Sequence, residues 1–267
     1  MIITFSSMKG GVGKSTNAIL VAANLAARGF RVAFFDLDTN NSGTMYFTQG
    51  IEDITDIIET HNVFESLSHN DLDNYIIHSR FENIDIIPSH LNIFKLRGIG
   101  YNELQKTLRG YEEKYDYVII DTAPTYDNIV INALLVADYI ITPIKFSSFD
   151  FTTTKFLQKQ LYDDCPNQVG KWYLLYSDWQ MKYEKYPNTP QMQLAEVFEN
   201  EFNNILNIHI PRTNAASDYT QCDTKLNLNA RSSQTAHQLA VEINRLVNML
   251  TLPEEQVNDE SKFAEKF

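Results

Sequence analysis

The chain has 267 residues, of which 43% are hydrophobic, and its formal net charge is −12. This length and apolar content suffice for one substantial buried core, so we expect a single α/β domain. The negative charge excludes a protein coated with nucleic-acid-binding basic side chains, although a local basic patch stays compatible with it.

The sequence carries no pattern typical of export or of membrane insertion. A lysine and a glycine loop interrupt the first apolar run, and no apolar stretch is long enough to span a bilayer. The two cysteines, Cys165 and Cys222, have no companion residues at metal-ligand spacing and are expected to be ordinary thiols. We therefore expect a soluble, cytosolic protein.

An anion-binding loop is predicted near the N-terminus. Residues 2–5 are apolar and β-prone, residues 8–16 read MKGGVGKST, and residues 17–27 carry small and apolar residues at helical spacing. A strand, a glycine loop and a helix in this order form the setting that a phosphate-binding loop requires. The loop glycines let backbone N–H groups turn towards an anion, and the helix start adds its own unpaired N–H groups.

The polar residues of this loop predict a bound ATP or GTP with its metal. Lys14 can reach the β- and γ-phosphates, Ser15 can offer its hydroxyl to Mg²⁺, and Thr16 can donate to a further phosphate oxygen. A glycine turn that merely joins a strand to a helix is the alternative. The predicted nucleotide-binding residues here are Lys9, Gly10, Gly11, Val12, Gly13, Lys14, Ser15 and Thr16.

Three carboxylates follow predicted strands. Asp36 and Asp38 come after the predicted strand 31–35, and Asp121 ends the apolar run 117–120. Carboxylates at the carboxyl ends of parallel strands face the crevice where ligands bind, and an aspartate that follows a buried strand can hold Mg²⁺ opposite the loop serine. For the first two, a solvated turn that caps the next helix is the alternative.

The other segments alternate between helix and strand patterns, which predicts a doubly wound, mainly parallel sheet with helices on both faces. We expect helices at 53–60, 63–67, 128–137, 149–161, 190–203 and 235–250, strands at 83–89, 139–143, 172–176 and 205–210, a loop at 179–190, and a helical stretch at 91–115 that covers a face of the sheet. Asn128 and Asn132 are expected to be directed towards the nucleotide.

Several motifs together resemble one protein family. Lys9 stands where the phosphate-loop pattern G-x-x-x-x-G-K-[ST] begins with glycine, and the resulting K-G-G-x-G-K-[ST] resembles the deviant Walker A motif of the ParA/MinD family of dimeric ATPases. Residues 121–124 (DTAP), 137–143 (ADYIITP) and 211–214 (PRTN) are similar to further motifs of that family, in the family order. The resemblance covers about residues 1–250.

The resemblance implies a P-loop NTPase domain at 1–250, and we expect residues 251–267 to be an acidic, flexible tail. It implies catalytic roles for Lys9, Lys14 and Asp38, with Asp38 acting on the attacking water. It also implies Mg²⁺ ligation by Ser15, Asp38 and Asp121, and a place near the adenine base for Pro211 and Arg212.

The family further implies that ATP locks two subunits into a homodimer in which Lys9 reaches the partner's nucleotide. A ParB-like, centromere-binding protein would stimulate slow hydrolysis, and the dimer would bind duplex DNA non-specifically on the nucleoid to segregate a plasmid or chromosome. Arg231, with Lys225 and Arg245, is the predicted DNA contact. The sequence departs from the family pattern at Thr39 and Asn40, and at residues 215–217, where a second arginine is absent.

Two alternatives stay open at this stage. A MinD-like ATPase would need an amphipathic C-terminal helix, and residues 261–267, with two Phe against two Lys and one Glu, offer too little apolar surface for a stable membrane anchor. An ATPase that positions a non-DNA cargo, or a metabolic relative, is the other possibility. Metabolic relatives usually carry a C-x-x-C motif, which is absent here.

Overall fold

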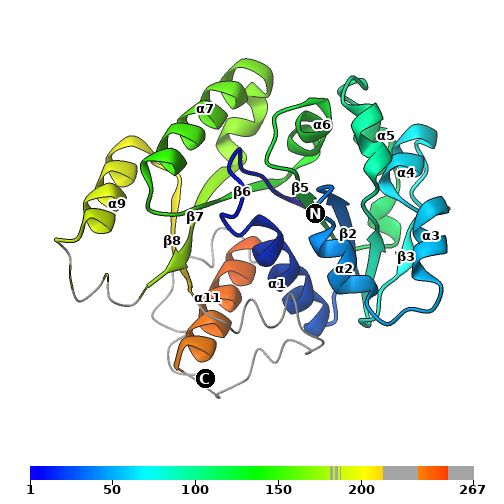
Figure 1. Cartoon of the computed structure of the whole chain (residues 1–267), viewed down its shortest axis with the longest axis horizontal. Helices are drawn as coiled ribbons and strands as arrows, with labels where there is room; N and C mark the ends of the chain where they lie inside the picture. Colours follow the sequence, from blue (N-terminus) through cyan, green and yellow to red (C-terminus); the bar gives the residue numbers. More distant parts are fainter. Residues whose placement is uncertain (181–182, 184–185, 187, 213–233, 252–267) are drawn as a thin grey trace.

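A sheet of eight strands forms the centre of the molecule (Figure 1). The computed structural model describes residues 1–180, 183, 186, 188–212 and 234–251. The strands lie in the order β3-β4-β2-β5-β1-β6-β7-β8, and every pairing is parallel except that of β3 with β4. The predicted doubly wound, mainly parallel sheet is confirmed.

The strands are β1 (Ile2–Phe5), β2 (Val32–Leu37), β3 (Ile77–His78), β4 (Ile84–Ile87), β5 (Tyr117–Thr122), β6 (Tyr139–Ile144), β7 (Trp172–Trp179) and β8 (Ile205–Pro211). The α-helices are α1 (Lys14–Ala27), α2 (Ser42–Thr48), α3 (Ile54–Thr60), α4 (Val63–His69), α5 (Glu103–Thr107), α6 (Asn128–Val136), α7 (Ser148–Asp164), α9 (Pro190–Glu201) and α11 (Gln234–Thr251). Short 3-10 helices occupy Leu91–Leu96, Tyr111–Glu113 and Pro166–Lys171.

Helices cover both faces of the sheet, which explains why its central strands are apolar throughout rather than alternating. Figure 1 shows α1 and α11 side by side on one face, where their apolar residues pack into a common core with α2. On α11, Leu239, Ile243, Leu246 and Leu250 recur at the spacing of one helix face, and all four are buried. Helices α4, α5, α6, α7 and α9 pack on the other face.

The register of the three central strands brings the predicted site residues to one edge. Phe5, the last residue of β1, and Asp36 of β2 are both Cα partners of Asp121 on β5. Because these strands are parallel, the loop after β1 and the carboxylates of β2 and β5 emerge at the same carboxyl edge. The sheet therefore assembles the site from segments far apart in the sequence.

Most predicted elements are present, with ends within a few residues, but the helical stretch at 91–115 is wrong as a continuous element. Only short pieces form there, a 3-10 turn at Leu91–Leu96, the helix α5 and a second 3-10 turn at Tyr111–Glu113. Gly110 interrupts it in a left-handed conformation, φ 77°, which a helix cannot continue through. The buried Leu104 and Leu108 still cover the sheet face as expected.

Other boundaries also differ from expectation. Helix α2 and the short strand β3 have no counterpart in the sequence-based prediction. Helix α11 includes Thr251, which we expected to begin the tail, while residues 252–267 lie outside the described part, so the division into domain and tail stays a prediction. None of the helices that the structure describes is both long and apolar enough to cross a membrane.

We predict that Gly43→Ala on α2 lowers the free energy of unfolding by about 1–3 kcal/mol. A Cβ at Gly43 would lie 2.4 Å from Cε1 of Phe34, a fully buried ring packed against Phe47 at 4.8 Å between centroids. The helix propensity of alanine favours the change by only about 1 kcal/mol, so the overlap decides the sign.

Urea denaturation measures this effect, with Gly98→Ala as the matched control, since nothing lies within 4 Å of a Cβ there. A Gly43→Ala protein as stable as the wild type would show that the Phe34 ring has room to shift.

Candidate nucleotide-binding site

A cavity of about 540 Å³ opens at the carboxyl edge of the sheet. The predicted nucleotide-binding residues that line it are Gly10, Gly11, Gly13, Lys14, Ser15, Thr16, Pro211 and Arg212, and Asp38 joins them. Two of the predicted residues lie elsewhere, since Val12 is buried and Lys9 is directed to another element. Residues of the glycine loop and residues 211–212, which are at least 195 positions apart in sequence, thus line the same cavity.

The glycine loop is held in shape by β7. Gly13 takes φ 100°, and a Cβ there would lie 2.6 Å from Oγ of Ser177. Asn17, on the first turn of α1, donates from Nδ2 to the carbonyl oxygen of Gly13 at 2.8 Å and to Oγ of Ser177 at 3.3 Å. Only glycine fits this approach, so the loop opens onto the start of α1, where free N–H groups favour an anion.

Lys14 is the buried cation of the site, with 6% of its surface exposed. Burial lowers the pKa of its ammonium, and the carboxylates of Asp121 and Asp38 oppose that shift. A lysine taken out of water this far needs anionic neighbours. The carboxylates of Asp121 and Asp38, together with the phosphate groups expected in the cavity, would stabilise the charged ammonium of Lys14.

The residues at the end of β5 fit a magnesium ion. Asp121 is fully buried, and neither of its carboxylate oxygens has a hydrogen-bond partner within the described residues. Burial, and then the neighbouring Asp36, raise the pKa of Asp121 well above its usual range, while the Ser15 hydroxyl and Lys14 oppose the shift. The Ser15 hydroxyl is near Asp121 but makes no hydrogen bond of normal geometry with it, so the buried carboxylate is free to bind a cation such as Mg²⁺, directly or through a metal-bound water.

Asp36 and Asp38 differ in their surroundings. Asp36 accepts hydrogen bonds from the backbone N–H and the hydroxyl of Thr44, at 2.7 and 2.8 Å, and so fixes the start of α2. Burial raises the pKa of Asp36 to about 6, although these hydrogen bonds oppose it. The carboxylate of Asp38 accepts a hydrogen bond from the N–H of Asn40, at 3.0 Å, and it lines the cavity. Asp36 therefore anchors α2, and Asp38 is the one of the two that lines the cavity.

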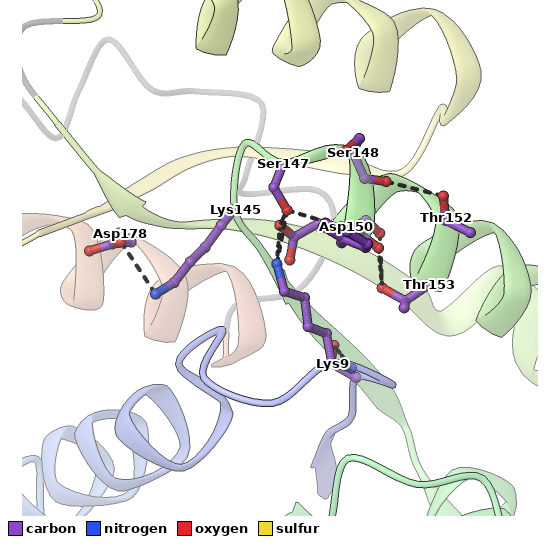
Figure 2. Close-up of polar contacts among 10 residues, drawn as sticks. Lys9, Lys145, Ser147, Ser148, Asp150, Thr152, Thr153 and Asp178 are labelled. Atoms are coloured by element: carbon purple, nitrogen blue, oxygen red, sulfur yellow. Dashed lines mark hydrogen bonds and ion pairs between the residues drawn. The ribbon is translucent and has the colours of Figure 1, made fainter.

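Lys9 points away from its own cavity. Its ammonium donates to Oγ of Ser147 and to Oδ2 of Asp150, each at 2.8 Å, at the start of α7 (Figure 2). Asp150 is 2% exposed, and it also accepts a short hydrogen bond from the Ser147 hydroxyl. The lysine thus neutralises a buried carboxylate, which would lose its charged partner if the lysine moved away.

Lys145 and Asp178, which the sequence patterns did not single out, also line the cavity. The Lys145 ammonium lies 3.3 Å from the Asp178 carboxylate (Figure 2), and Nε of Arg212 lies 3.7 Å from it. Asp178 has φ 63° within an irregular pairing of β7 with β8, which redirects its side chain. Lys145 directly follows β6 and Asp178 lies near the end of β7, and these positions at strand ends could have marked both as site residues.

The expectation for Asn128 and Asn132 is wrong. Nδ2 of Asn128 donates to the carbonyl oxygen of Ile99, and the Asn132 amide bonds to Gly100 and to the N–H of Leu104. Both side chains hold the loop before α5 rather than face the nucleotide cavity, because buried backbone groups there need partners.

The predicted DNA contacts are only partly described. Arg245 on α11 donates to both carboxylate oxygens of Glu242, at 3.2 and 3.1 Å, and to the carbonyl oxygen of Asn207 at 2.9 Å. It therefore ties α11 to β8. Lys225 and Arg231 lie outside the described residues, and the role of all three in DNA binding stays a prediction. No group of three or more His, Cys, Asp or Glu that could hold a metal occurs in the described part.

Comparison with known proteins gives one family match and several relatives. The family described as AAA domain (AAA_31) matches residues 1–162. The chain is 30% identical to the sporulation initiation inhibitor protein Soj of Bacillus subtilis, over 61% of this chain and 68% of Soj. It is 32% identical to the virulence plasmid ParA family protein pGP5-D of Chlamydia psittaci, over 54% of this chain and 58% of that protein.

A solved structure extends the likeness over the whole fold. A putative plasmid partition protein from Borrelia burgdorferi, bound to AMPPNP, is 26% identical with a TM-score of 0.75, covering 94% of this chain and 99% of that one. Coverage of the curated relatives varies, since the matched region spans 79% of a Methanocaldococcus jannaschii protein but 48%, about half, of two from Mycobacterium tuberculosis.

We predict that Lys14→Ala weakens nucleotide binding about 10- to 100-fold, because a charge-assisted hydrogen bond contributes about 1.5–3 kcal/mol. Titration with a fluorescent ATP analogue measures it. Lys159→Ala, which removes an exposed lysine of α7, is the matched control and should bind as the wild type does. Unchanged affinity in Lys14→Ala would refute the assignment of this cavity.

Proposed function

Because the chain belongs to the ParA/MinD-type family of P-loop ATPases, we propose that it is a partition ATPase that binds Mg²⁺-ATP, forms a homodimer with it and hydrolyses it slowly. One observation carries this proposal. The sheet brings Lys14, Ser15 and Asp38 into the lining of a 540 Å³ cavity that opens on a helix start, and the fully buried Asp121 of β5 is close to Lys14 and Ser15. The fold alone would not suffice, since this architecture serves many activities.

Hydrolysis needs a positioned water and a stabilised phosphoryl group. Ser15 and Asp121 would hold Mg²⁺, which would neutralise charge on the β- and γ-phosphates. Lys14 binds the same phosphates from the loop. Asp38 accepts a hydrogen bond from Asn40 through one oxygen, and its other oxygen would orient the attacking water. Asp38 would also contribute to the binding of Mg²⁺.

The position of Lys9 supports action across a dimer. The lysine has no contact with its own cavity and is held instead by Ser147 and Asp150. A local role in nucleotide binding would require it to face inward. The γ-phosphate of a nucleotide held by a second copy would supply the anion that replaces Asp150, so that release of Lys9 is coupled to dimer formation.

We further propose that the dimer is cytoplasmic and binds the duplex DNA of the nucleoid non-specifically. A ParB-like protein would stimulate hydrolysis and so release the dimer from the DNA. The names of the Chlamydia and Borrelia relatives, a virulence plasmid protein and a putative plasmid partition protein, support a plasmid cargo. The net charge of −12 and the internal ion pair of Arg245 favour the second candidate, an ATPase that positions a non-DNA cargo.

We predict opposite effects for two substitutions at the site. Lys9→Ala should bind ATP but fail to dimerise, because the contact to the partner's nucleotide is lost. Asp38→Ala should bind ATP and accumulate as a dimer, because the attacking water is no longer oriented. Sedimentation velocity and phosphate release with ATP measure both. An ATP-dependent dimer of Lys9→Ala with full turnover would place the lysine outside the mechanism.

We predict that DNA binding requires ATP and falls steeply with salt, with a log–log slope of about −0.9 for each phosphate neutralised. Arg231→Ala should weaken binding and flatten the slope by about one phosphate. Arg109→Ala, an exposed arginine after α5, is the matched control. Binding that ignores the nucleotide, or an Arg231→Ala variant with wild-type slope, would favour the non-DNA cargo.

A further inference from the structure

We propose that, in the nucleotide-bound dimer, each subunit inserts the ring of Phe149 into a small apolar pocket beside the other subunit's nucleotide cavity. The inference rests on the proposed function, since it needs two copies to meet with their cavities facing. It adds an interaction surface to that function and assigns a residue to each side of it.

Phe149 is the inserted residue. It is the second residue of α7 and is 75% exposed, the highest value for a large hydrophobic residue in the described part of the chain. A single exposed ring is common on protein surfaces, but the position of this one is distinctive. It lies in sequence between Ser147 and Asp150, the two residues that hold the Lys9 ammonium.

The receiving pocket has a volume of about 210 Å³. Leu37, Ile93, Ala123 and Pro124 supply apolar walls. A protein cavity of about 150 Å³ accepts benzene, so this one has room for a single phenylalanine ring but not for a helix. The pocket therefore suits one aromatic side chain.

One wall of the pocket is suited to an aromatic ring in particular. Phe94 is 46% exposed, and the guanidinium of Arg97 lies 4.4 Å from the centre of its ring. The same guanidinium is held by the Asp127 carboxylate, at 3.3 Å. An incoming ring can pack edge-to-face on Phe94 and meet the Arg97 cation, both of which favour an aromatic over an aliphatic side chain.

The pocket adjoins the nucleotide cavity, and the two share Asp38, Asn40 and Pro124 as lining residues. If Lys9 of one copy reaches the nucleotide of the other, the start of α7, to which Lys9 is bonded here, comes close to this shared wall. A two-fold axis then produces the contact twice, each ring entering the opposite pocket. This makes a second copy of the chain the occupant.

An inserted ring would also act on hydrolysis. The pocket lies between the residues that follow β2 and those that follow β5, which carry Asp38 and the loop after Asp121. Filling it fixes both segments against each other. Dimerisation would then order the residue proposed to position the attacking water.

The test compares Phe149→Ala with Phe156→Ala in the full chain, by sedimentation equilibrium with Mg²⁺ and AMPPNP. Phe156 is 46% exposed and lies two turns further along α7, about 10 Å away, which makes it a matched control. Phe149→Ala should raise the dimer dissociation constant at least about tenfold, and Phe156→Ala should leave it unchanged. Thermal unfolding of each variant's monomer checks that the fold is intact.

A crosslinking experiment identifies the pocket. Chains with Phe149→Cys are mixed with chains with Phe94→Cys, both in a Cys222→Ser background, and treated with a short bis-maleimide. A crosslinked heterodimer should form with AMPPNP and not with ADP, whereas Phe156→Cys with Phe94→Cys should give none. A wild type that stays monomeric with AMPPNP overturns the proposed dimer and this inference together. A dimer that Phe149→Ala leaves intact, or one without the 149–94 crosslink, overturns this inference alone and points to a different protein as the occupant of the pocket.

Discussion

The site depends on the burial of one ammonium beside two carboxylates. Lys14 is almost wholly removed from water, and Asp121 and Asp38 compensate for the hydration that it loses. Because Lys14 begins α1 while the carboxylates belong to β5 and the residues after β2, this charge balance links three segments of the chain. A change in any one of them would alter the electrostatics of the whole cavity.

The two aspartates at the carboxyl end of β2, one inside the strand and one just after it, differ in their surroundings although they are close in sequence. Asp36 accepts two hydrogen bonds from Thr44 and so anchors α2, and burial raises the pKa of its carboxyl to about 6. Asp38, two positions later, is directed into the cavity. Successive residues of a strand alternate between its faces, so two residues of one D-x-D motif start on the same side. The two side chains have different surroundings because β2 ends at Leu37, between them.

Lys9 is held by the start of α7 and does not line the nucleotide cavity. Its ammonium satisfies the buried Asp150, which keeps it from the cavity and holds the start of α7 against the glycine loop. In the proposed dimer the same lysine would exchange a carboxylate for a phosphate of the other subunit. Lys9 would then pair with Asp150 in the free subunit and with the partner's phosphate in the dimer, so its ion pair would differ between the two states.

The sequence by itself determined the strand–loop–helix order at residues 2–27, the carboxylates after β2 and β5 and the parallel α/β sheet, because short-range patterns dictate these features. It failed for residues 91–115, where Gly110 breaks a helical pattern, and for Asn128 and Asn132, whose amides serve nearby backbone groups. Only the tertiary structure placed Lys145 and Asp178 in the lining of the cavity, directed Lys9 towards Asp150 and brought a pocket beside Asp38. Such contacts join residues of different elements, 33 positions apart for Lys145 and Asp178 and 141 for Lys9 and Asp150, and their partners follow from strand register and packing, which no local pattern specifies.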